Sequence, residues 1–242
     1  MSTRVTPPAR RRSEADTVER IVDVAERMFA ESGYRGVSLR AIMRECGVNA
    51  AAVHYHFGSK EALLEKIFER RAGTLNAERL QLLGALTGST RGRARAAGTA
   101  GQDALLLEKI LDAFLRPSFG WPDAGHADRG AEVRRFTRLR SVLAHEDAAL
   151  SQRLIERHFN ETSKCFVAAL RNALPHLPES ALFWRFHFLL GAQFYTLSNP
   201  GRVESLSDGS FDGGSLQQAL DEMIAFVAAG FRAPLPNAAA AL

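Results

Sequence analysis

The sequence predicts an all-α fold with a small N-terminal domain of three helices and a larger C-terminal helical domain. Three observations predict it. Apolar residues recur at helical spacing in almost every segment, capping residues and glycines bound those segments, and no alternating apolar pattern indicates a β-hairpin. We place the two domains at residues 14–62 and 63–232, between a basic arm at 1–13 and a tail at 233–242.

The composition is that of a water-soluble globular protein. The 242 residues are 46% hydrophobic and 24% charged, and a net charge of +4 does not by itself indicate a nucleic-acid partner. Cys46 and Cys165 lie far apart, which excludes a disulfide framework and a cysteine metal site. No apolar run reaches the ~18–20 residues of a membrane span, and the N-terminus lacks the apolar core of a signal peptide. We therefore expect a cytoplasmic protein without membrane contact.

The first predicted helix follows the basic arm. Residues 1–13 contain four arginines and little apolar surface, so we expect a disordered arm that either follows DNA phosphates or only aids solubility. Asp16 begins a pattern similar to a capping box. Apolar residues then recur at helical spacing from Ile21 onward, and Gly33 ends the helix.

Residues 38–60 predict a helix-turn-helix. Ser38 is placed to cap a short helix, and Gly47 is placed to make a turn after it. Asn49 is placed to cap a second short helix over residues 50–57, and Ser59 a long helix that reaches about residue 86. Two short helices joined at a glycine are a motif that reads the major groove, so we expect double-stranded DNA as a partner.

Side chains on and beside the second short helix have the chemistry to contact DNA. Ala50 and Ala51 allow a close approach to base edges, and the Arg40 guanidinium matches the two acceptors of a guanine. Lys60, at a helix start, favours a phosphate. Arg40 can alternatively be a solvated surface charge, and Tyr55 a core aromatic. His54 can alternatively pack beside the turn, and His56 can orient the turn instead of contacting DNA. The predicted DNA-contacting residues are Ser38, Arg40, Asn49, Ala50, Ala51, His54, Tyr55, His56 and Lys60.

Residues 17–64 resemble the DNA-binding domain of the TetR family of bacterial transcriptional regulators. The segments that carry the resemblance are FAESGY at 29–34, SLRAI at 38–42, GV at 47–48, YHF at 55–57 and SKEAL at 59–63. The resemblance implies a repressor that binds a palindromic operator and is released by a small molecule. The chain departs from the family at His54, where a tyrosine that touches a phosphate is usual, and at Met43, where alanine is frequent.

The C-terminal domain is predicted as a series of helices. Apolar residues recur at helical spacing within 106–114, 133–143, 150–170, 182–197 and 216–231. We expect a mobile loop at 87–102 and a Gly- and Ser-rich loop before the last helix. The long helix that begins at Ser59 joins the N-terminal domain to this part, so it is the expected lever between them.

The sequence also predicts a homodimer. One reading module contacts too few base pairs for tight specific binding, whereas two modules on a two-fold axis read a palindrome. In proteins similar to TetR the last two long helices pair across this axis; the alternative is that they are monomer core. The predicted interface residues are Trp184, Phe188, Tyr195, Leu216, Met223 and Val227.

The middle helices predict a pocket for a hydrophobic or amphipathic effector. Aromatic residues at helical spacing would line it, with Arg140 or His158 as a polar contact, although such residues can equally be core. The predicted pocket residues are Phe114, Phe136, Arg140, His158, Phe159, Phe166 and Phe186.

An enzyme is not expected, because no paired carboxylates, metal-ligand spacing or nucleophile motif is present. We accordingly expect no catalytic residue, metal ion or cofactor. Two other functions stay open. One is an architectural DNA-binding protein without an effector, and the other is an enzyme or lipid carrier built on a helical bundle.

Overall fold

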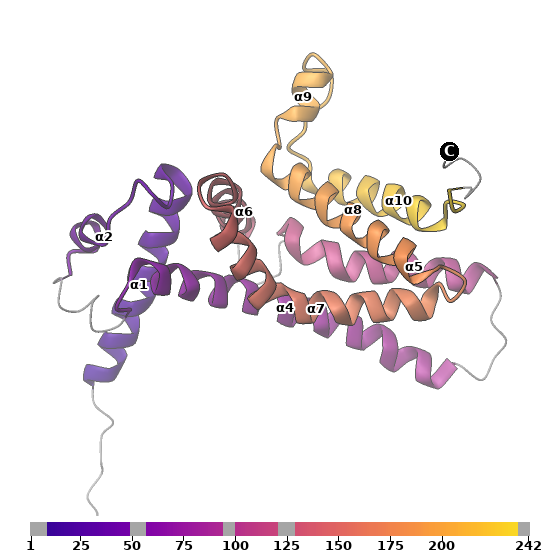
Figure 1. Ribbon diagram of the computed structural model, residues 1–242, viewed down its shortest axis with the longest axis horizontal. Helices are drawn as coiled ribbons and strands as arrows, with labels where there is room; N and C mark the ends of the chain where they lie inside the picture. The colour runs from indigo at the N-terminus through magenta and orange to yellow at the C-terminus, as the bar shows by residue number, and fades with distance from the viewer. Residues whose placement is uncertain (1–8, 49–56, 94–99, 121–128, 237–242) are drawn as a thin grey trace, which may run out of the picture. The chain divides into compact units, whose positions relative to one another are not determined.

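The computed structural model describes residues 9–48, 57–93, 100–120 and 129–236 (Figure 1). These residues form helices and no β-strand, as the sequence predicted. None of the helices in this part of the chain combines the length and hydropathy that a membrane span requires. The helices are α1 (Ala9–Ser32), α2 (Leu39–Cys46), α4 (Lys60–Arg93), α5 (Ala100–Leu115), the 3-10 helix η1 (Arg116–Phe119), α6 (Arg129–Glu146), α7 (Ala148–Ala173), α8 (Glu179–Ser198), α9 (Arg202–Leu206) and α10 (Leu216–Arg232).

The chain folds into two compact units that are not continuous in sequence. Unit 1 comprises Met1–Arg71 and Arg138–Ile155, and unit 2 comprises Ala72–Thr137 and Glu156–Leu242. This division differs from the predicted single boundary after residue 62. The first part of α4 belongs with unit 1, and so does the corner formed by the end of α6 and the start of α7.

The core of unit 1 is built from the apolar faces of α1, α2 and α4. Ile21 and Phe29 of α1, Ile42 of α2, and Leu63 and Phe68 of α4 are all almost completely buried. Burying a side chain of this size contributes about 1.5–3 kcal/mol. The helical spacing that predicted these helices therefore also identifies the residues that hold α2 against α1.

The core of unit 2 is a bundle in which α10 packs against α5 and α8. Phe114 of α5 lies at its centre. Its ring meets the rings of Phe166 on α7 and Phe186 on α8 edge-on, with centroids 5.0 and 5.2 Å away. Edge-to-face contacts of this kind suit the aromatic quadrupole, so these three residues fix the relative positions of three helices.

Three features differ from the sequence prediction. Helix α1 begins at Ala9, so residues 9–13 are helical where we expected a disordered arm, because alanine and arginine favour helices. Helix α4 continues to Arg93 through half of the predicted loop at 87–102. A short helix, α9, also interrupts the loop between α8 and α10.

Candidate functional site

Helix α2, the first helix of the predicted helix-turn-helix, is bounded by the residues that the sequence indicated. Ser38 has extended backbone angles, and its Oγ accepts a hydrogen bond of 3.2 Å from the Ala41 N–H. At the other end Gly47 adopts the left-handed conformation with φ of 64°, and its N–H bonds the carbonyl of Arg44. These caps satisfy backbone groups that a helix of eight residues would otherwise expose.

The burial of its apolar residues determines which face of α2 points outward. Ile42, Met43 and Cys46 are buried, whereas Arg40 and Arg44 are exposed. The two arginines are four residues apart and so share one face of the helix. Within the described part of the chain, neither arginine makes an ion pair or side-chain hydrogen bond. Arg40 was predicted for this surface; Arg44 was not, although its spacing from Arg40 is the signal that could have found it.

The ammonium group of Lys60 points inward, not toward solvent as the sequence had indicated. Its Nζ donates to the carbonyl oxygens of Tyr34 at 2.9 Å and Val37 at 3.1 Å, and lies 4.3 Å from the centre of the Tyr34 ring. Two of its three N–H groups are therefore engaged with the turn that precedes α2. Lys60 thus holds the backbone that leads directly to the Ser38 cap.

The second helix of the motif lies outside the described residues. Among the predicted DNA contacts this applies to Asn49, Ala50, Ala51, His54, Tyr55 and His56. The chain is described again at Phe57, and Gly58 adopts a left-handed φ of 69°. Ser59 then caps α4, since its Oγ accepts a hydrogen bond of 3.0 Å from the Ala62 N–H.

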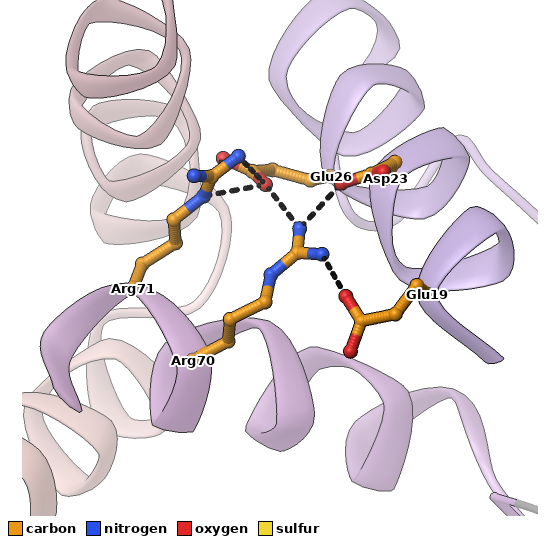
Figure 2. Close-up of polar contacts among 5 residues, drawn as sticks. All are labelled: Glu19, Asp23, Glu26, Arg70 and Arg71. Carbon is orange, nitrogen blue, oxygen red and sulfur yellow. Dashed lines mark hydrogen bonds and ion pairs between the residues drawn. The ribbon is translucent and has the colours of Figure 1, made fainter. Parts of the chain in front are cut away.

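A cluster of five charged side chains joins α1 to α4 within unit 1 (Figure 2). Arg70 Nη1 binds Glu19 at 2.9 Å, and Arg70 Nη2 binds Asp23 at 2.7 Å and Glu26 at 3.0 Å. Arg71 Nε binds both carboxylate oxygens of Glu26, at 3.0 and 2.9 Å. The cluster fastens α1 to the last residues of α4 that belong to unit 1. The sequence analysis missed it, although its three acids recur at helical spacing on α1.

Glu26 is the central residue of this α1–α4 ion cluster, because its side chain is completely buried. Burial raises the pKa of Glu26 above its ordinary value of 4.5, while Arg71 and then Arg70 act in the opposite direction. A buried carboxylate is tolerated only when charged or polar groups satisfy it, so the two arginines are structural requirements.

The α6–α7 corner also contacts the turn before α2. The Glu146 carboxylate accepts a hydrogen bond of 2.9 Å from the Arg35 N–H. Gly33 has a φ of +82°, and a Cβ at this position would collide with the same carboxylate. Arg153 binds Glu61 at the start of α4, at 3.0 Å. The turn over residues 33–38 is therefore held by Lys60 from one helix and Glu146 from another.

Comparison with known families gives two matches along the chain. Residues 21–67 match the model described as bacterial regulatory proteins, tetR family. Residues 112–230 match the model described as tetracyclin repressor-like, C-terminal domain.

The chain belongs to the TetR family.

Curated relatives match the chain over short stretches. The transcriptional regulator UidR of Escherichia coli K12 is 37% identical over 51 residues, which are 21% of this chain and 26% of UidR. The A-factor receptor protein of Streptomyces griseus is 31% identical over 70 residues, 29% of this chain and 25% of the receptor. The chain thus matches about a quarter of the length of these curated relatives.

Solved structures extend the likeness to the whole fold. Salmonella enterica GusR superposes with a TM-score of 0.58 at 14% identity, over 96% of this chain and 100% of GusR. The fatty acid degradation regulator FadR from Bacillus halodurans gives a TM-score of 0.55 at 16% identity, over 96% of this chain and 100% of FadR. At these identities the likeness concerns the TetR fold alone.

The predicted pocket residues of this TetR-family chain are mostly core. Phe114, Phe166 and Phe186 form the aromatic centre of unit 2, and Phe136 and Phe159 are also buried. The backbone carbonyl of His158 accepts a hydrogen bond of 2.6 Å from Asn76 Nδ2. Arg140 belongs to unit 1, so it is not grouped with the other six residues. Burial lowers its pKa to about 10.

Two side-chain amides in unit 2 have a buried polar atom that is not hydrogen-bonded to any described residue. Asn76 Oδ1 and Gln193 Nε2 are buried without a hydrogen-bond partner in the described part of the chain. Gln193 follows Leu182, Phe186 and Leu189 on the buried face of α8. A buried amide without a partner is unfavourable unless another molecule completes it.

The predicted dimer residues divide into two groups. Trp184, Phe188 and Tyr195 of α8 are exposed, as an interface requires, and the Trp184 and Phe188 rings stack with centroids 5.8 Å apart. Leu216 is half-buried and packs against the unit 2 core. Met223 and Val227 must be corrected: they are buried in that core, because their face of α10 packs against α5 and α8.

The outward position on α10 belongs instead to Phe226, which the sequence analysis missed. Its side chain is 74% exposed, whereas its neighbour Val227 is 6% exposed. Phe226 therefore adds a large aromatic side chain to the exposed surface of unit 2. The signal was present in the sequence as an apolar residue one position off the core stripe.

Proposed function

We propose that the chain is a transcriptional repressor that binds a palindromic operator as a homodimer and is released by a small apolar or amphipathic effector. The main support for this proposal comes from unit 1. Its capped helix α2 exposes Arg40 and Arg44, and residues 21–67 match the TetR family. Soluble regulators of this kind act in the cytoplasm, which is the proposed location.

In this proposal Arg40 reads a base edge and Arg44 contacts the phosphate backbone. Arg40 lies in the first turn of α2, directly after the Ser38 cap, and its guanidinium can donate two parallel hydrogen bonds to one guanine. Lys60 contributes by holding the turn before α2. The remaining proposed contacts come from Ser38 and from the second helix, namely Asn49, Ala50, Ala51, His54, Tyr55 and His56.

The exposed aromatic face of unit 2 supports the proposed dimer. Trp184, Phe188 and Tyr195 on α8 and Phe226 on α10 present large apolar side chains to solvent. Aromatic residues dominate the energetics of protein interfaces, and a two-fold axis would bring the same face of both copies together. The two copies of unit 1 in the dimer would then bind successive turns of the DNA duplex.

The proposed effector would act by a shift in population. Helix α4 belongs to unit 1 up to Arg71 and to unit 2 from Ala72. The α1–α4 ion cluster fastens α1 to α4 just before this boundary. A movement of α4 would therefore also move the DNA-binding helices of unit 1. An effector that binds the operator-incompetent arrangement more tightly would release the DNA. Gln193 and Asn76 are each proposed as a polar contact, because each has a buried amide atom without a hydrogen-bond partner among the described residues.

Selection of bound fragments from genomic DNA would test this function. We expect a palindrome with two half-sites. Arg40→Ala should lower affinity for that operator by about 1–3 kcal/mol and affect random DNA less. Equal losses on operator and random DNA would contradict base reading. Recovery of no preferred sequence at low ionic strength would overturn the function as a whole.

A further inference from the structure

The segment between α8 and α10, residues 199–215, forms an ordered arm that stands out from these two helices (Figure 1). Its backbone is fixed by local hydrogen bonds. The Phe211 N–H bonds Ser207 Oγ at 3.1 Å, the Gly214 N–H bonds Asp212 Oδ1 at 2.7 Å, and Gly209 takes a left-handed φ of +78°. The arm therefore has a defined backbone conformation.

This ordered arm presents apolar side chains to solvent. Leu206 is 66% exposed and Phe211 is 63% exposed, and Val203 is exposed beside them. Exposed apolar residues grouped on one projecting element indicate a surface that another molecule covers. The arm also carries three carboxylates and one arginine, a net charge of −2. That charge disfavours DNA phosphates and anionic lipid surfaces as the covering molecule and favours a protein.

A groove on the same unit has complementary properties. It lies between α7 and α8 and has a volume of about 620 Å³. Phe183, Trp184 and Leu190 give it an apolar wall, and its lining contains Lys164 but no carboxylate within the described residues. Lys164 is paired with Glu161 at 2.7 Å, but both side chains are largely exposed, so this pair is weak and the ammonium can meet a second carboxylate.

We propose that the arm of each copy docks into the α7–α8 groove of the other copy and clasps the dimer. This inference rests on the proposed homodimer. A two-fold axis across α8 sets the two copies of that helix antiparallel. The C-terminal end of one α8, from which the arm departs, then lies beside the N-terminal half of the other α8, which lines the groove.

The residues of α8 suit such a crossing. A Cβ at Gly191 would meet no atom within 4 Å, so this position lies open between the exposed Phe188 and Tyr195 and allows a close approach of two helices. The apolar tip of the arm would fill the groove, and its carboxylates would lie near Lys164. Because the contact is made twice in a two-fold dimer, each substitution acts twice.

The test compares an arm variant with a matched control by sedimentation over a dilution series, together with rates of subunit exchange. Leu206→Ser combined with Phe211→Ser should weaken the dimer at least tenfold, or accelerate exchange to the same degree. Leu80→Ser removes an exposed apolar side chain from α4 and should change neither value. Circular dichroism should show that both variants keep the helical fold.

Charge reversal tests whether the arm binds in the α7–α8 groove beside Lys164. Lys164→Glu should weaken the dimer, and Glu204→Lys on the arm should restore part of the loss when the two are combined. An arm variant with the same dissociation constant and exchange rate as the wild type would overturn the clasp while leaving the dimer intact. A wild-type chain that stays monomeric at every concentration would instead overturn the proposed dimer, and the clasp with it.

Discussion

Replacement of Glu26 by alanine should destabilise the protein strongly. The Glu26 side chain is completely buried and accepts hydrogen bonds from Arg70 at 3.0 Å and from Arg71 at 3.0 and 2.9 Å. Its loss leaves two partly buried guanidinium groups without this carboxylate. Arg70 keeps its ion pairs with Glu19 and Asp23. Removing one partner of a buried ion pair costs about 3–5 kcal/mol.

A loss of this size is a large fraction of the ~5–15 kcal/mol that stabilises a typical domain. At about 2–4 °C per kcal/mol for a chain of this length, the melting temperature should fall by roughly 6–20 °C. Urea unfolding followed by circular dichroism gives the free energy directly. Glu19→Ala is the matched control, because Glu19 is an exposed member of the same cluster and should cost less than about 1 kcal/mol.

The pH dependence gives an independent check on Glu26. Burial raises its pKa in the folded protein above 4.5, so the folded state binds this proton more tightly than the unfolded state. The stability that this proton contributes is present in full below pH 4.5 and is lost as the pH rises through the folded pKa. Glu26→Gln, which cannot ionise, should lack this decline when compared with wild type.

If Glu26→Ala proves as mild as Glu19→Ala, the cluster does not hold α1 to α4.

Other predictions test the remaining sites. Lys60→Ala should weaken operator binding and speed amide exchange at residues 34–38 without changing the salt dependence of binding; a slope flatter by about one unit would show that Lys60 contacts a phosphate after all. Phe226→Glu should give monomers that keep the helical fold by circular dichroism, whereas Val227→Asp should unfold unit 2, because it places a charge in the core; a dimeric Phe226→Glu variant would move the interface elsewhere. Gln193→Leu should leave the free energy of unfolding unchanged or higher, while effector binding measured by calorimetry falls; undiminished binding would remove Gln193 from the pocket.

Features that depend on neighbours in the sequence were predictable. The caps at Ser38, Gly47 and Ser59 act within one helical turn, so the sequence pattern placed the bounds of α2 and the start of α4 correctly. The family followed from the same local motifs. Helix α9 escaped prediction because five residues in a Gly- and Ser-rich segment carry too little periodicity to be distinguished from a loop.

Features that depend on distant contacts were not predictable. The inward direction of Lys60 is decided by carbonyl groups more than twenty residues away, and the burial of Glu26 by arginines on another helix. Helix α10 is apolar on more than one face, and the position of Phe226 one residue off the core stripe was only a weak signal that it lies at the surface while Val227 lies in the core. The packing of α10 against α5 and α8 decides which of the two residues is buried.

The presence of the α6–α7 corner in unit 1 restricts how this regulator can be recombined with others. A graft cut after Arg71 would leave behind the carboxylate of Glu146, and with it the group that receives the Arg35 N–H. A working graft from this chain should therefore carry residues 138–155 along with 1–71, as two inserted pieces instead of one.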